Sequence, residues 1–115
     1  MTTTDNGIER RRFKRYVKAV PLSYEVELES GWVAGHGQLI TVDLSAGGAR
    51  VRCEHEVTVG QRLAISMDLE GHHFSPVATV VWVSPSRIEG QVVAGLNFED
   101  ADDASRARFE QALDT

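Results

Sequence analysis

The sequence predicts an all-β fold: a small, six-stranded antiparallel β-barrel with a short C-terminal α-helix and a flexible N-terminal arm. Three observations support this prediction. Several short segments alternate apolar and polar residues, turn signals such as Ser30-Gly31 and Glu70-Gly71 separate them, and the last segment has helical spacing instead. Because 115 residues suffice for one modest core, we expect a single domain.

The alternating segments define the expected strands in chain order. In the first, Leu22, Tyr24, Val26 and Leu28 alternate with a serine and three glutamates, which predicts a half-buried strand with an acidic outer face. A second strand is expected from residue 32 to about residue 45, loosened by two glycines. Further strands are expected at residues 49–54, 63–69, 73–83 and 91–98, with Pro76 at an edge or a bulge.

The C-terminal segment predicts the helix. Asp102 or Asp103 is suited to cap a helix over residues 102–113. Phe109, Ala112 and Leu113 fall on one face of that helix. We therefore expect the helix to pack this face against the barrel.

The N-terminal region carries the most concentrated charge. Residues 1–7 are polar and rich in threonine, so we expect a disordered tail before a domain that spans residues 8–115. Six of the twelve Lys and Arg residues fall within residues 9–18, although the chain has a net charge of −5. We therefore expect a basic arm over residues 8–18 that holds a small anion at one place, and not a surface for long polyanions.

Composition restricts the class of protein. The apolar runs are too short to span a bilayer, and the N-terminus lacks the apolar stretch of a secretory signal. The single cysteine, Cys53, excludes an intramolecular disulfide, and its alternation with apolar neighbours predicts a small core residue. We therefore expect a cytoplasmic protein without membrane insertion.

Within the basic arm, Arg10, Arg11 and Arg15 form the pattern Arg-Arg-x-x-x-Arg. The spacing of four places Arg11 and Arg15 on one side of an extended segment, and also on one side of a helix. Paired guanidiniums can hold a phosphate bidentately or bind O6 and N7 of guanine, while Arg10 reaches a second group. The alternative is a solvated basic tail that touches nucleic acid or an acidic partner.

A second polar cluster lies at the end of the second expected strand, at Asp43, Ser45 and Gly48. Alternation predicts that Asp43 and Ser45 point outward while Val42 and Leu44 enter the core. Asp43 can accept from N1–H and N2–H of guanine, Ser45 can donate to a phosphate, and Gly48 suits a positive φ or a close backbone approach. The alternative is a turn in which Asp43 and Ser45 satisfy backbone groups.

The two clusters together resemble the PilZ domain family. Its signature is Arg-Arg-x-x-x-Arg followed, some thirty residues later, by Asp/Asn-x-Ser-x-x-Gly, and the Gly95-Leu96-Asn97-Phe98 segment is similar to its last strand. The resemblance implies a bacterial receptor for cyclic di-GMP on a six-stranded barrel, with an arm that is mobile without ligand and folds over the nucleotide. It also implies a context of motility, adhesion or biofilm control.

Residue by residue, the resemblance implies that Arg11 and Arg15 grip guanine and phosphate. It implies that Asp43 and Ser45 hold the guanine edge and phosphate from the barrel wall, and that Gly48 permits close approach. An arginine in the position of Arg10 accompanies an intercalated ligand dimer in this family, so we expect two ligands per chain. Without an attached output domain, the signal is expected to pass to an unidentified downstream protein.

Other residues add no catalytic or metal site. The sequence shows no nucleophile–base motif or phosphate-binding loop, so we expect no enzyme and no cofactor. His72 and His73 face opposite sides of a strand and cannot easily share a metal ion. Trp82 is interpreted as a core or rim residue, with base stacking as the alternative. Two further functions stay open: a ligand-independent interaction module, and a nucleic-acid-binding barrel, which the acidic strand faces disfavour.

Overall fold

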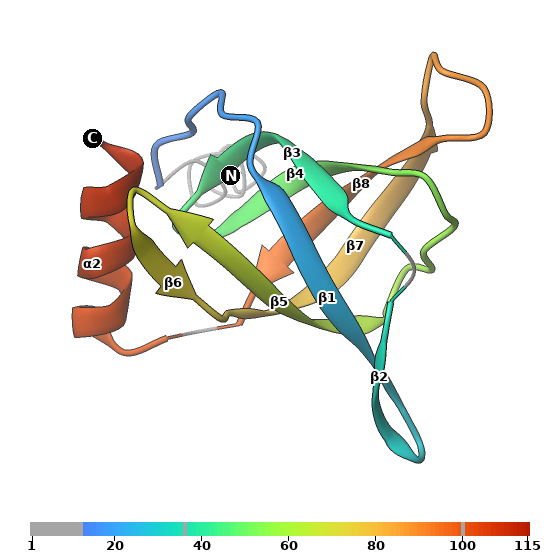
Figure 1. Cartoon of the computed structure of the whole chain (residues 1–115), viewed down its shortest axis with the longest axis horizontal. Coiled ribbons are helices and arrows are strands. Elements are labelled where there is room, and N and C mark those ends of the chain that lie inside the picture. The colour runs from blue at the N-terminus through green and yellow to red at the C-terminus, as the bar shows by residue number, and fades with distance from the viewer. Residues whose placement is uncertain (1–12, 36, 100) are drawn as a thin grey trace, which may run out of the picture.

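Six strands form a closed antiparallel barrel in the computed structural model, which describes residues 13–35, 37–99 and 101–115 (Figure 1). The order around the barrel is β1-β3-β4-β8-β7-β5, and β5 closes it by pairing with β1. The barrel strands are β1 (Pro21–Leu28), β3 (Leu39–Ser45), β4 (Gly48–Cys53), β5 (Arg62–Leu69), β7 (Val77–Pro85) and β8 (Val92–Phe98). Two short strands, β2 (Gly31–Ala34) and β6 (His72–Phe74), extend β1 and β5 as hairpins. The predicted six-stranded antiparallel barrel is confirmed.

The barrel core consists of the inward residues of the alternating segments. Leu22, Val51, Leu63 and Val80 are fully buried, and Cys53 lies among them as predicted. Burial raises the pKa of the Cys53 thiol to about 11. The thiol therefore stays protonated and packs as a small apolar group.

Two expected strands are each divided in the structure. The segment expected as one strand from residue 32 becomes β2 and β3, because the chain crosses Tyr24 at Gly35, where a Cβ atom would collide with the Tyr24 ring. The segment expected at 73–83 becomes β6 and β7, with the break at Pro76, which has no N–H for a ladder. Leu28, expected inside, is 50% exposed because β1 pairs there with β2 alone.

The predicted helix is present as α2 (Asp103–Leu113), which lies beside one end of the barrel (Figure 1). The Asp102 carboxylate caps it by accepting from the Ser105 N–H at 2.7 Å, and this hydrogen bond holds the pKa of Asp102 below its ordinary value. The Phe109 ring packs edge-on against Phe74 and Phe98, at centroid distances of 4.9 and 6.0 Å. The face predicted to be buried is therefore the face that seals the barrel end.

The described part of the basic arm, residues 13–18, lies along the barrel. Tyr16 and Leu44 exchange two backbone hydrogen bonds of 2.8 and 2.9 Å, and the Tyr16 hydroxyl donates to Asp114 at the end of α2. Burial and this hydrogen bond raise the pKa of Tyr16. The expected tail, and the expected arm up to residue 12, lie outside the described residues.

In the part of the chain that is described, no helix is long and apolar enough to cross a membrane.

Candidate ligand-binding site

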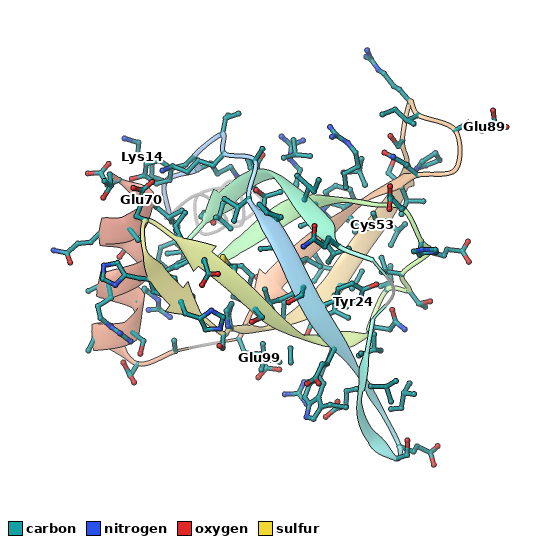
Figure 2. The ribbon with its side chains drawn as sticks, viewed as in Figure 1. Lys14, Tyr24, Cys53, Glu70, Glu89 and Glu99 are labelled. Atoms are coloured by element: carbon teal, nitrogen blue, oxygen red, sulfur yellow. The ribbon has the colours of Figure 1, made fainter. Side chains whose placement is uncertain are left out.

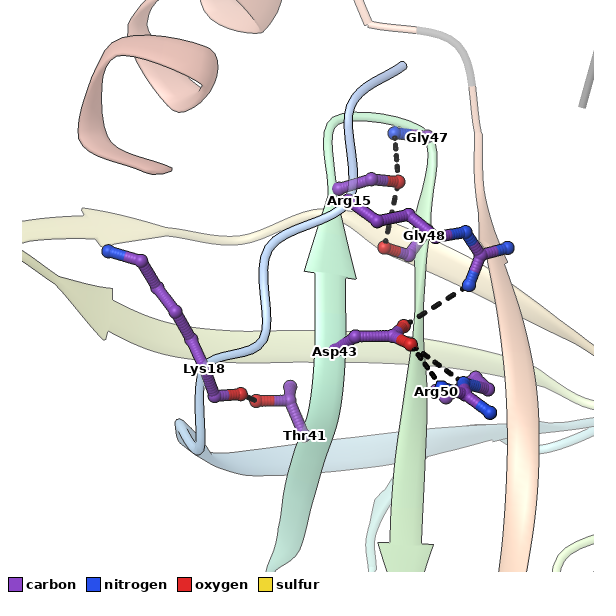
Figure 3. Close-up of polar contacts among 8 residues, drawn as sticks. Arg15, Lys18, Thr41, Asp43, Gly47, Gly48 and Arg50 are labelled. Carbon is purple, nitrogen blue, oxygen red and sulfur yellow. Dashed lines mark hydrogen bonds and ion pairs between the residues drawn. The ribbon is translucent and has the colours of Figure 1, made fainter. Parts of the chain in front are cut away.

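Asp43 is the centre of the site that the structure assembles (Figure 3). Its Oδ1 lies 3.3 Å from Nη1 of Arg15, and its Oδ2 lies 2.7 and 2.6 Å from Nε and Nη2 of Arg50. Burying an unpaired carboxylate is costly, so these two guanidiniums are what make the position of Asp43 tolerable. Arg15 reaches Asp43 from the arm, so the structure brings together one residue of each sequence cluster.

A β-bulge in β3 sets the direction of the Asp43 side chain. The pairing with β4 shifts between Thr41, opposite Val51, and Asp43, opposite Arg50, so that Val42 has no partner of its own. Thr41 therefore turns inward, where its hydroxyl binds the backbone of the arm, while Asp43 points outward as predicted. The expectation that Val42 enters the core is wrong, because Val42 is the bulged residue and is half-buried.

Arg50 is the functional candidate that sequence reasoning missed. It lies directly across from Asp43 because Ser45 pairs with Gly48 through a two-residue turn, which fixes the register of β3 and β4. Pairing the residues outward from the turn, Ser45 with Gly48 and Leu44 with Ala49, would have placed Arg50 opposite Asp43. The side chains of Arg15 and Arg50 are 59% and 47% exposed, so both keep a solvent-facing surface beside the buried carboxylate.

Ser45 and Gly48 hold the tip of this hairpin. The Ser45 hydroxyl accepts from the Gly47 N–H at 3.2 Å and donates to the Gly48 carbonyl at 3.3 Å, which is the turn-stabilising role that the sequence left open. Gly48 does not have a positive φ. A Cβ atom there would collide with the Leu96 carbonyl of β8, so close backbone approach is what requires a glycine.

An open groove of about 1220 Å³ begins at this hairpin and extends to α2. Trp82 lies on its floor, 40% exposed, with its indole ring across Gly95. A bulge between Val80 and Trp82 turns the indole to the outer face, so Trp82 is no core residue. The position in the groove favours the stacking alternative over the core interpretation.

The groove is cationic although the chain is acidic. Four described arginines line it, and Glu99 is the single acidic residue among its described lining residues. Arg62 binds the Glu99 carboxylate at 2.7 Å and lowers its pKa. The lining arginines are Arg15, Arg50, Arg106 and Arg108. This charge distribution favours an anionic ligand in the groove over an extended polyanion on the whole surface.

The histidines form no metal site within the described ranges. His73 instead hydrogen-bonds Ser66 through Nε2 at 3.1 Å and Asp68 through Nδ1 at 2.9 Å. This order is that of a serine hydrolase, but those enzymes bury the carboxylate, whereas the Asp68 side chain is 82% exposed. We therefore assign these contacts to pairing of β5 with β6.

Of the predicted site residues, Arg10 and Arg11 lie outside the described residues.

Known proteins place this architecture in one family. The PilZ domain model matches residues 9–114, while no curated protein matches the sequence significantly. The inhibitor of motility MotI/DgrA of Bacillus subtilis has a similar structure, with a TM-score of 0.69 and 17% identity over 89% of this chain and 48% of that one. The chain therefore spans about half the length of that protein.

Two solved PilZ domains agree over almost their whole length. The PilZ domain of YcgR from Escherichia coli, solved with c-di-GMP, has a TM-score of 0.68 and 18% identity, and the match covers 91% of this chain and 92% of that one. The PilZ domain of CeSA from a cellulose-synthesizing bacterium has a TM-score of 0.61 and 17% identity, covering 88% and 98%. With the family model matching nearly all residues, the chain belongs to the PilZ domain family.

Proposed function

We propose that this chain is a receptor for cyclic di-GMP (c-di-GMP) that binds the dinucleotide between the basic arm and the barrel wall. The observation that carries this proposal is the Asp43 carboxylate held between Arg15 and Arg50, two arginines that line the cationic groove. Family membership supports the same ligand, since the similar PilZ domain of YcgR is solved with c-di-GMP.

The chemistry of the groove suits a guanine dinucleotide. An arginine can donate to O6 and N7 of guanine, while a carboxylate can accept from N1–H and N2–H on the opposite edge. Arg11 and Arg15 supply the first kind of group and Asp43 the second, with Ser45 donating to a phosphate after leaving its turn. In the structure, Arg15 and Arg50 both form ion pairs with the Asp43 carboxylate. Binding therefore exchanges these ion pairs for contacts to the nucleotide.

The cations of the arm suggest two ligands per chain. The open groove, about 1220 Å³ in volume, has room for more than one small molecule. Arg10, next to Arg11, supplies the additional cation that an intercalated dimer needs. We therefore propose that the chain binds a c-di-GMP dimer and that Arg10 contacts its second member.

The output is a change in the arm, without catalysis. Tyr16 ties the arm both to β3 and to the end of α2, so a movement of residues 8–18 over the ligand changes the surface shared by the arm and the helix. We propose that a downstream protein in the cytoplasm reads this surface, in control of motility or biofilm formation.

A calorimetric titration with three ligands tests the proposal. We expect saturable binding of c-di-GMP, at least a hundredfold weaker binding of GMP, and no binding of a short DNA duplex at physiological salt. Binding of the duplex alone would instead support the nucleic-acid-binding alternative, and its affinity would then fall steeply with salt. If neither c-di-GMP nor the duplex binds, the alternative of a ligand-independent interaction module remains.

A further inference from the structure

The far wall of the groove is formed by the helix α2. Ser105, Arg106, Arg108 and Phe109 all line it. Ser105 and Phe109 are one helical turn apart and face the groove, and the two arginines flank this face on either side. The groove therefore has arginines on two walls. The arm and the hairpin form one wall, and the helix forms the other.

Phe13 joins the two walls. Its ring lies against the hairpin turn, where a Cβ atom at Gly47 would collide with it, and the Arg106 guanidinium lies 5.3 Å from its centroid. Arg106 is thus placed next to the arm and the hairpin that carry Arg15 and Asp43. The stacked geometry also fixes the direction of a side chain that would otherwise sample many rotamers.

Helix stability does not explain the two arginines. Cations stabilise a helix near its C-terminus, but the last turn of α2 holds no basic residue and both arginines precede it. Arg108 does lower the pKa of Asp102 through its charge, but this carboxylate is already bound by the Ser105 N–H. What the two arginines share is their position on the groove wall.

We propose that Arg106 and Arg108 bind phosphate groups of the nucleotide in the groove, which makes α2 part of the binding site. The inference rests on the proposed function, and it names residues outside the Arg-Arg-x-x-x-Arg and Asp-x-Ser-x-x-Gly patterns. A cyclic dinucleotide carries two phosphates on opposite sides of its ring, so arginines on a second wall can bind the phosphate that faces away from the hairpin. The helix supplies the second wall, and ligand binding is thereby coupled directly to the position of α2.

The test is calorimetric affinity of the whole chain for c-di-GMP in Arg106→Gln, Arg108→Gln and the double variant. Arg87→Gln is the matched control, because Arg87 is exposed in the β7–β8 connection and does not line the groove. Figure 2 shows Glu89 of this connection at the end of the molecule opposite α2. We expect about tenfold weaker binding for each single variant and about hundredfold for the double, as one charged hydrogen bond each would give.

Two further measurements separate a binding role from a structural one. The melting temperature of the ligand-free variants should match that of the parent chain. Arg106→Lys, which keeps the charge but not the planar group on Phe13, should bind more tightly than Arg106→Gln. If all helix variants bind like Arg87→Gln while Arg15→Ala loses binding, the inference is wrong and the proposed function stands. If the parent chain itself does not bind c-di-GMP, the proposed function fails and the inference fails with it.

Discussion

At the scale of single residues, Asp43 connects the two sequence clusters. Its side chain is only 6% exposed, and its carboxylate is shared between an arginine of the arm and an arginine across the hairpin. Its outward direction could be predicted from alternation in β3. Its burial could not, because that depends on Arg15, which is 28 residues away in the chain and covers it only after the arm docks.

Arg15→Ala should remove binding without unfolding the chain. The side chain is largely exposed and Asp43 keeps Arg50 as a partner, so we expect a stability loss of only about 0–1 kcal/mol. The lost contacts to guanine and phosphate should weaken c-di-GMP binding by roughly a hundredfold or more. Calorimetry gives the affinity and thermal unfolding gives the stability. Unchanged affinity in this variant would remove the arginine clamp from the proposal.

Gly48→Ala should destabilise the barrel more than Gly47→Ala. The new methyl group at residue 48 meets the rigid Leu96 carbonyl, whereas at residue 47 it meets the side chain of Phe13, which can move. We expect a loss of roughly 1–3 kcal/mol for Gly48→Ala and a smaller loss for its neighbour. Urea unfolding of both variants measures the difference. Equal stabilities would show that β4 and β8 do not approach as closely as described.

At the scale of elements, local patterns identified the strands but not their interruptions. The periods of two and of 3.6 residues located the barrel strands and α2. The breaks at Gly35 and Pro76, and the bulges in β3 and β7, depend on how distant strands meet. The bulge in β7 is what moves Trp82 from the core to the groove, and nothing in a run of valines signals it.

The helix cap gives a pH-dependent prediction. The folded-state pKa of Asp102 is lowered from 3.8, so its contribution to stability is present above that pH and is lost as the pH falls through the lowered value. Asp102→Ala should therefore lower the melting temperature at pH 7, and the difference from the parent chain should shrink below pH 3.8. Asp103→Ala is a suitable control within the same turn. A difference that stayed constant with pH would contradict capping by the ionised carboxylate.

At the scale of the whole molecule, closure of the barrel and the location of the groove follow from topology. The β1–β5 pairing that closes the sheet joins residues about forty positions apart, and it brings the arm, the hairpin and α2 to one groove. The composition indicated an acidic chain with one basic arm. The arginines on α2 line the same groove as those of the arm and the hairpin, and composition alone does not indicate this.

The stoichiometry is a property of the whole groove. The parent chain should bind two molecules of c-di-GMP, and Arg10→Ala should bind one, because Arg10 is proposed to contact the second member of the dimer. Analytical ultracentrifugation with an absorbance scan at the guanine wavelength counts bound ligand per chain. If the parent chain binds only one molecule of c-di-GMP, the proposed receptor function stands and the proposed ligand dimer is excluded.

The most direct test of the central claim is a titration of the ¹⁵N-labelled whole chain with c-di-GMP, followed by backbone amide NMR. We expect saturable shifts in the arm, in residues 43–50 around Asp43 and Arg50, and in α2, with GMP at the same concentration causing little change. The β1–β2 hairpin, which does not line the groove, should stay unshifted. An absence of saturable shifts, or shifts confined to the β1–β2 hairpin, would contradict the proposal that this PilZ domain binds c-di-GMP at the Asp43 site.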